Sequence, residues 1–182
     1  MSGERVIEIR AIGDVPYSVI SHLAESLNEI FATDVRIGNA VPIPPGSYDP
    51  ARRQYLSGAF LEGLASAFPG SDGKVLGVTR VDLYTPGLNF VFGQAQLNGR
   101  FAVISTARLD PAFWGEGPDS ALFRRRVLKE AVHELGHTYG LEHCPDPKCV
   151  MHFSNSIADT DLKDTSFCER CARRIGLKDR RL

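Results

Sequence analysis

The chain has 182 residues, of which 43% are hydrophobic and 24% charged, and its formal net charge is −1. This length accommodates one sizeable core but is short for two independent ones, so we expect a single domain over residues 1–182. The small net charge gives no reason to expect nucleic acid or an anionic membrane as partner, and no apolar run approaches a membrane span. The first residues mix charged with aliphatic side chains, unlike a signal peptide, so we expect a cytoplasmic protein, and a monomer.

The first half of the chain alternates between strand and helix patterns. Residues 5–12 alternate in polarity and predict a strand. Apolar side chains then recur at helical spacing over residues 16–31, and a second short strand is predicted at residues 33–37. After a proline-rich loop, the Asp-Pro pair at residues 49–50 predicts the start of a second helix, which Pro-Gly at residues 69–70 ends.

Strand patterns dominate the next part of the chain. Residues 74–84 are rich in β-branched side chains, and residues 89–97 and 100–106 flank Asn-Gly, a strong hairpin signal. Antiparallel strands thus follow strands that helices connect, which predicts an α+β fold with a mixed, mostly parallel, twisted five-stranded sheet and an antiparallel edge strand. If residues 89–97 form that edge, their free backbone groups could hold an extended peptide; the alternative is an edge that a loop merely covers.

A third helix is predicted to begin at residues 117–120, with Asp119 or Ser120 as its cap. The spacing of Arg126 and Glu130 predicts an i,i+4 ion pair on its surface. A stripe of larger side chains can pack this helix beneath the sheet: Leu128, Val132, Leu135 and Tyr139.

The candidate zinc ligands and the candidate general base lie in one stretch, His-Glu-Leu-Gly-His-Thr-Tyr-Gly-Leu-Glu-His. On a helix, His133 and His137 project from one face about one turn apart, and Glu134 lies beside them as the candidate general base. Gly140 can adopt a left-handed conformation that ends the helix. The chain can then turn back, so that His143 reaches the metal ion that His133 and His137 would bind. Three imidazole nitrogens that leave a fourth position open are typical of a catalytic zinc site.

The cysteines all lie in the last quarter of the chain and form two close pairs: Cys144, Cys149, Cys168 and Cys171. Without an export signal, this spacing predicts a tetrahedral structural zinc site, and hence two zinc ions per chain. The zinc would stabilise a small C-terminal subdomain (140–182) next to an N-terminal one (1–139), and would help to fix His143. Two disulfides are the alternative, and a redox dithiol at the second pair lacks the thioredoxin-like strand before it.

The combined pattern over residues 130–171 resembles the archaemetzincin family of metzincin zinc metallopeptidases. The resemblance rests on the three histidines, the adjoining cysteine, Met151 after them and the late Cys-x-x-Cys. The gap between Met151 and Cys168 is about one residue shorter than the family pattern, which a loop can absorb.

The resemblance implies a metzincin-like fold with a Met-turn, in which Met151 forms an apolar floor beneath the catalytic zinc. No tyrosine follows Met151, so the group that stabilises the oxyanion is not identified, and His152 is either a contact of the site or a solvated residue. The residues that match zinc ligands are His133, His137 and His143 for the catalytic ion and Cys144, Cys149, Cys168 and Cys171 for the structural ion. Glu134 matches the general base.

We therefore expect a zinc-dependent metallopeptidase that hydrolyses peptide or protein substrates with zinc-activated water. The first alternative is a zinc-binding scaffold of metzincin fold with little or no proteolytic activity. The second is a nucleic-acid module that uses the cysteine site and the basic C-terminal residues. No aromatic platform for stacking bases accompanies those residues, so we expect no nucleic-acid partner. We also expect no membrane partner, because the net charge is small and no apolar run is long enough to span a membrane.

Overall fold

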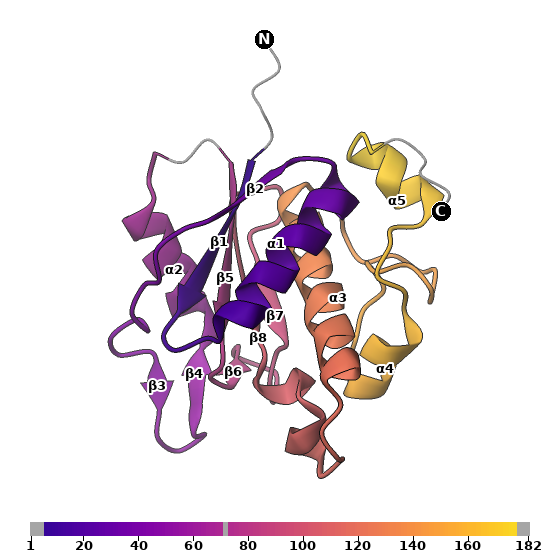
Figure 1. Ribbon diagram of the computed structural model, residues 1–182. Coiled ribbons are helices and arrows are strands. Elements are labelled where there is room, and N and C mark those ends of the chain that lie inside the picture. Colours follow the sequence, from indigo (N-terminus) through magenta and orange to yellow (C-terminus); the bar gives the residue numbers. More distant parts are fainter. Residues whose placement is uncertain (1–5, 71–72, 178–182) are drawn as a thin grey trace.

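The computed structural model describes residues 6–70 and 73–177 (Figure 1). Arg5, the first residue of the first predicted strand, lies outside them. The larger sheet has the strand order β2-β1-β5-β8-β7, and only the β7–β8 pair is antiparallel. Its strands are β1 (Val6–Ile12), β2 (Asp34–Ile37), β5 (Lys74–Thr79), β7 (Gly93–Ala95) and β8 (Phe101–Ser105). The predicted mixed sheet with an antiparallel edge strand is confirmed.

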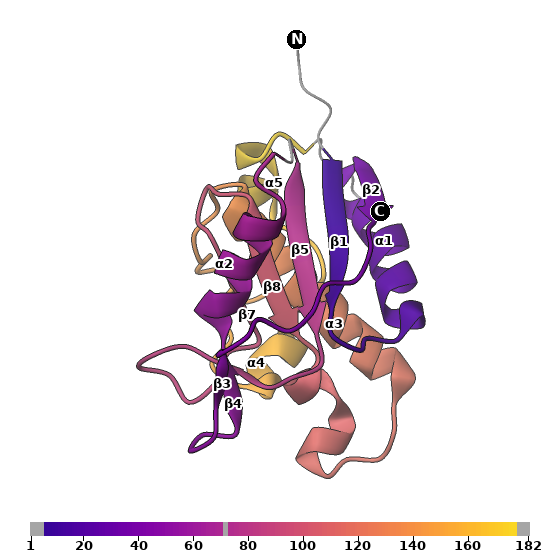
Figure 2. The ribbon, with the colours of Figure 1, turned by 90° about the vertical axis from the view of Figure 1, so that its left-hand side faces the viewer.

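Helices cover both faces of this sheet, as Figure 2 shows from the side. The helices α1 (Tyr17–Phe31) and α3 (Ser120–Thr138) pack on one face, and α2 (Ser57–Ala67) packs on the other. Successive side chains of a strand point to opposite faces, so each strand contributes to both cores. In β5, for example, Leu76 faces α1 and α3, whereas Val75 faces α2.

The predicted start of the second helix is wrong. Residues 48–56 form a hairpin of β3 (Tyr48–Asp49) and β4 (Gln54–Leu56), and β4 also pairs with β6 (Leu83–Tyr84). The Asp49 carboxylate accepts backbone N–H groups two and three residues on, which stabilises a turn, and Arg53 closes this turn with a φ of +56°. The pairing with β6 also divides the strand predicted over residues 74–84 between two sheets.

The active-site helix begins as predicted, because the Asp119 side chain accepts the Leu122 N–H at 2.8 Å and caps it. Gly140 has a φ of +85° directly after the helix ends. The predicted Arg126–Glu130 ion pair is wrong. Arg126 is buried, with a relative accessibility of 2%, and binds Asp161 instead. Both predicted partners lie on a side of α3 that the C-terminal segment covers.

That segment contains α4 (Ile157–Leu162) and α5 (Glu169–Arg174), beside α3 in Figure 1. Two 3-10 turns precede α3, η1 (Ala107–Leu109) and η2 (Pro111–Trp114). Among the described residues, none of the helices has both the length and the apolar character that crossing a membrane requires.

Candidate metal centres

The structure brings the three predicted histidines together. His133 and His137 lie one turn apart on α3, and the chain turns at Gly140 to place His143 opposite them. One ring nitrogen of each histidine lies within 4.8 Å of the corresponding atom of the other two. His133 is buried, His137 is half-buried and His143 is exposed. The ring centres are 4.7 to 5.4 Å apart.

Backbone carbonyls determine which nitrogens face the centre. His133 Nδ1 lies 2.8 Å from Val150 O, and His137 Nδ1 lies 2.7 Å from Leu141 O. A carbonyl oxygen can only accept, so each Nδ1 carries a proton and each Nε2 presents a lone pair. The two Nε2 atoms are 3.1 Å apart. Two lone pairs this close repel each other unless a cation lies between them, so the donor set fits a metal ion such as zinc.

Burial favours the neutral form of these three rings, which is the form that binds a metal ion. Burial, reinforced by the nearby Lys163 ammonium, holds the pKa of His133 well below its usual range. Burial likewise lowers the pKa of His137 and of His143.

Glu134 lies beside the histidines in a buried position, with a relative accessibility of 6%. Burial, and secondarily the Glu130 carboxylate, raise the pKa of Glu134 well above its ordinary value, and Lys163 opposes this in part. The edge strand packs directly on this side chain: a Cβ on Gly93 would lie 2.6 Å from Glu134 Cγ. A glycine at this position of β7 therefore leaves the space that Glu134 fills.

A buried ion pair supports the site from behind, and sequence reasoning missed it. Lys163 Nζ lies 3.0 Å from Glu130 Oε1 and 3.4 Å from His133 Nδ1, and the Thr160 hydroxyl also donates to Glu130 Oε1 at 3.1 Å. Lys163 stands in an aspartate-rich stretch that is typical of a solvated surface. No local pattern could have identified its partner Glu130, which lies on α3.

Met151 is fully buried and packs against α3 between the two helical histidines. A Cβ on Gly136 would overlap the Met151 sulfur, so the close approach depends on this glycine. His152 Nδ1 lies 2.9 Å from Cys144 O. This contact links the segment after Met151 to the start of the cysteine cluster.

A cavity of about 730 Å³ opens in front of the histidines. The segment 87–95, which ends in β7, lines one side, together with Leu97. Glu142 and Phe153 line the other side, and the Phe153 ring centre lies 5.0 Å from that of His143. The sequence did not single out these two residues, since an exposed glutamate and a lone aromatic residue carry no recognisable pattern.

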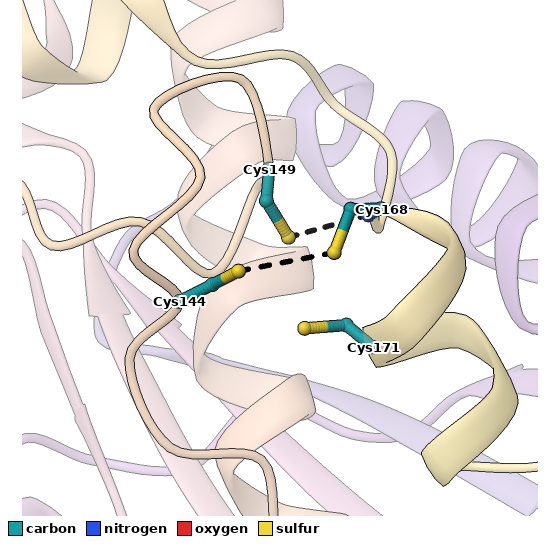
Figure 3. Close-up of side chains that lie close together, drawn as sticks. All are labelled: Cys144, Cys149, Cys168 and Cys171. Carbon is teal, nitrogen blue, oxygen red and sulfur yellow. Dashed lines mark hydrogen bonds between the residues drawn. The ribbon is translucent and has the colours of Figure 1, made fainter.

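The four cysteines also converge, with all four sulfur atoms within 4.8 Å of one another (Figure 3). All are free thiols, which does not support the alternative of two disulfides. The first two come from the loop after α3, and the other two come from the start and first turn of α5. Cys144 Sγ lies 3.8 Å from Cys168 Sγ, and the Cys168 N–H donates to Cys149 Sγ at 3.3 Å.

The thiols differ in their ease of ionisation. Burial raises the pKa of Cys149 to about 11 and raises that of Cys171 as well. Burial acts to raise the pKa of Cys144, but its hydrogen bonds, first those from the Asp146 backbone and the Arg170 guanidinium, together lower that pKa overall. Four convergent sulfurs, two of them with raised pKa, fit a zinc ion, because a zinc-bound thiol loses its proton and the thiolates then surround a cation.

A helix that presents two histidines and a glutamate to a cleft, with a third histidine after a glycine turn, is typical of zinc metallopeptidases. Residues 64–177 match the model of Peptidase family M54. The archaemetzincin of Pyrococcus furiosus is 49% identical over 178 residues, which cover 93% of this chain and 92% of that protein. The archaemetzincin of Methanocaldococcus jannaschii is 44% identical over 167 residues (92% and 90%). The chain therefore belongs to the archaemetzincins, Peptidase family M54.

Solved structures of related proteins have the same fold as this chain. The crystal structure of archaemetzincin from Archaeoglobus fulgidus, complexed with malonate, superposes with a TM-score of 0.82 at 43% identity and covers 93% of this chain and 99% of that one. A zinc-dependent peptidase from Methanocorpusculum labreanum gives a TM-score of 0.84 at 28% identity (93% and 100%). The chain is a zinc metallopeptidase that acts on peptide or protein substrates, which confirms the predicted fold and class.

Proposed function

We propose that this protein hydrolyses peptide bonds at the three-histidine site, with His133, His137 and His143 as ligands of a catalytic zinc and Glu134 as general base. The observation that carries this proposal is the pair of Nε2 atoms 3.1 Å apart, whose rings are both held by backbone carbonyls, next to a buried carboxylate.

Each side chain has a distinct part in this mechanism. When bound, zinc supplies Lewis acidity, which polarises a carbonyl and makes water nucleophilic near neutral pH. Glu134 accepts the proton of the attacking water and later delivers it to the leaving amine. Burial raises the pKa of Glu134, so its carboxylate is a stronger base than that of an exposed glutamate. The carbonyls of Val150 and Leu141 hold the two helical imidazoles in their metal-binding orientation.

The substrate would bind in extended form along β7. Phe92 O accepts from Ser105 N at 2.8 Å, and Gln96 N donates to Phe101 O at 3.0 Å, so alternate residues of this segment bond to β8. The backbone groups of Gly93 and Ala95 therefore point away from β8. Since β7 is the last strand of its sheet, a peptide can add there by strand pairing next to Glu134.

The four cysteines would hold a second zinc, which makes two ions per chain. Their convergence on one point from the loop after α3 and from α5 supports this assignment. The second ion would stabilise residues 140–182 as a C-terminal subdomain of a single 182-residue domain, with Met151 as the apolar floor of the catalytic centre.

A library of quenched-fluorescence peptides tests this function. Zinc-loaded protein should cleave members of the library, 1,10-phenanthroline should stop the cleavage, and added zinc should restore it. If protein with zinc at the histidine site cleaves no member at all, the peptidase proposal is contradicted and the alternative of a zinc-binding scaffold is favoured.

A further inference from the structure

The wall of the cleft that carries β7 is tied to the rest of the protein by two cationic side chains from outside the site. We call residues 88–99 the cleft rim: they comprise the loop before β7, the strand itself and the turn to β8. Its residues from Leu88 to Ala95, and Leu97, line the cavity in front of the histidines. One end of the rim is bound by Arg52 and the other by Lys74.

Arg52 anchors the first end. Its guanidinium Nη2 donates to Leu88 O at 2.9 Å and to Asn89 O at 3.0 Å. The guanidinium carbon Cζ lies 4.3 Å from the centre of the Tyr84 ring. The buried amide of Gln54 donates to the same Asn89 O at 2.9 Å. Hydrogen bonds from a charged donor are roughly twice as strong as neutral ones, so Arg52 fixes a loop that has little regular structure of its own.

Lys74 anchors the second end and also reaches the active-site helix. Its ammonium donates to Gly99 O at 2.6 Å and to Thr138 O at 2.8 Å. The Asn98 N–H donates to the carbonyl of His137 at 2.9 Å. A cation at a helix C-terminus also interacts favourably with the helix dipole. The turn of the β7–β8 hairpin is thereby joined to the end of α3, at a residue of the histidine triad.

We propose that Lys74 and Arg52 are positioning residues that set the distance between the cleft rim and α3, and so the width of the peptide-binding groove. Lys74 bonds to both walls at once, which fixes their separation at one end. Arg52 fixes the position of the first residues of the cleft rim, Leu88 and Asn89, at the other end. Neither side chain is among those that line the cavity. The inference rests on the proposed binding of an extended peptide along β7, and it predicts an effect on substrate binding rather than on the chemical step.

Lys74→Met tests the second anchor, because methionine keeps most of the aliphatic stem and removes the donors. Amide hydrogen exchange at Asn98 and Gly99 should become at least about tenfold faster. KM for a library peptide that the wild type cleaves should rise about tenfold, the scale of one charge-assisted hydrogen bond, while kcat stays within about threefold. The zinc content should not change.

Lys129→Met is the matched control. Lys129 also bridges two backbone carbonyls, those of Thr160 and Asp161, each at 3.0 Å, but on the side of α3 that faces α4. Its replacement should lower stability without changing exchange at Asn98. A general loosening of the fold would instead raise exchange at Asn98 in both variants.

Arg52→Met tests the first anchor independently. Exchange at the amides of Leu88 and Val91, which bond to Thr85 O and Leu83 O, should accelerate, and KM should rise with kcat again little changed. Unchanged exchange in the rim of both anchor variants overturns the inference, and so does an unchanged KM despite faster exchange. If the wild type cleaves no peptide, the proposed function fails, and the exchange results alone decide whether these residues hold the rim.

Discussion

Replacing Glu134 with alanine should lower kcat/KM for peptide hydrolysis by about 10²- to 10⁴-fold, the range that a positioned general base contributes. The Glu134 side chain is buried beside the histidines and packs against Gly93. Glu130, one helical turn away, is committed to Lys163 and Thr160. The measurement is steady-state cleavage of a library peptide, with zinc content determined on the same preparation.

Glu62→Ala is the control for this change, because Glu62 is an exposed carboxylate on α2, on the opposite side of the sheet. It should leave turnover unaltered. Substantial cleavage by a Glu134→Ala protein that retains its zinc would remove Glu134 from the mechanism. Loss of both activity and zinc would show that the carboxylate serves metal binding rather than proton transfer.

Lys163→Met should lower the free energy of unfolding by about 3–5 kcal/mol, because it leaves Glu130 buried without its cationic partner. In a chain of this size, that loss corresponds to a fall in Tm of about 6–20 °C. Both side chains are almost fully buried, at 0% and 4% relative accessibility, so solvent cannot replace the missing ammonium. Urea denaturation followed by circular dichroism measures the change.

Two further variants make this result specific. The double variant Glu130→Met with Lys163→Met should recover most of the loss, since a buried ion pair is often replaced by apolar side chains at little cost. Lys148→Met removes an exposed lysine that donates to Leu162 O at 3.2 Å, and it should cost less than about 1 kcal/mol. Equal effects of Lys163→Met and Lys148→Met would contradict the account of a buried pair.

Local patterns predicted the parts of this structure that local geometry determines. The alternation over residues 5–12 and the helical period over residues 16–31 correspond to β1 and α1. The spacing from His133 to His143 likewise follows from the helix repeat and a glycine turn, so the sequence alone predicted that these rings converge. The four cysteines converge as their paired spacing predicted.

Features that depend on distant partners were not predictable in this way. The hairpin at residues 48–56 exists because β4 pairs with β6, far along the chain, and the Asp-Pro signal at its start fits a turn as well as a helix. Nothing in the local sequence distinguishes Lys163 from a surface lysine. It is buried only because α4 packs against α3 in the folded chain. The rim anchors Arg52 and Lys74 bind backbone carbonyls, which any sequence provides, so only the tertiary structure identifies them.

The central claim is that three imidazoles hold a zinc ion in the cleft. Anomalous diffraction recorded on both sides of the zinc absorption edge, from crystals of undenatured protein, tests it most directly. The account predicts two peaks per chain, one among His133, His137 and His143 and one among the four cysteine sulfurs. A single peak at the cysteines, with none between the histidines, would contradict it.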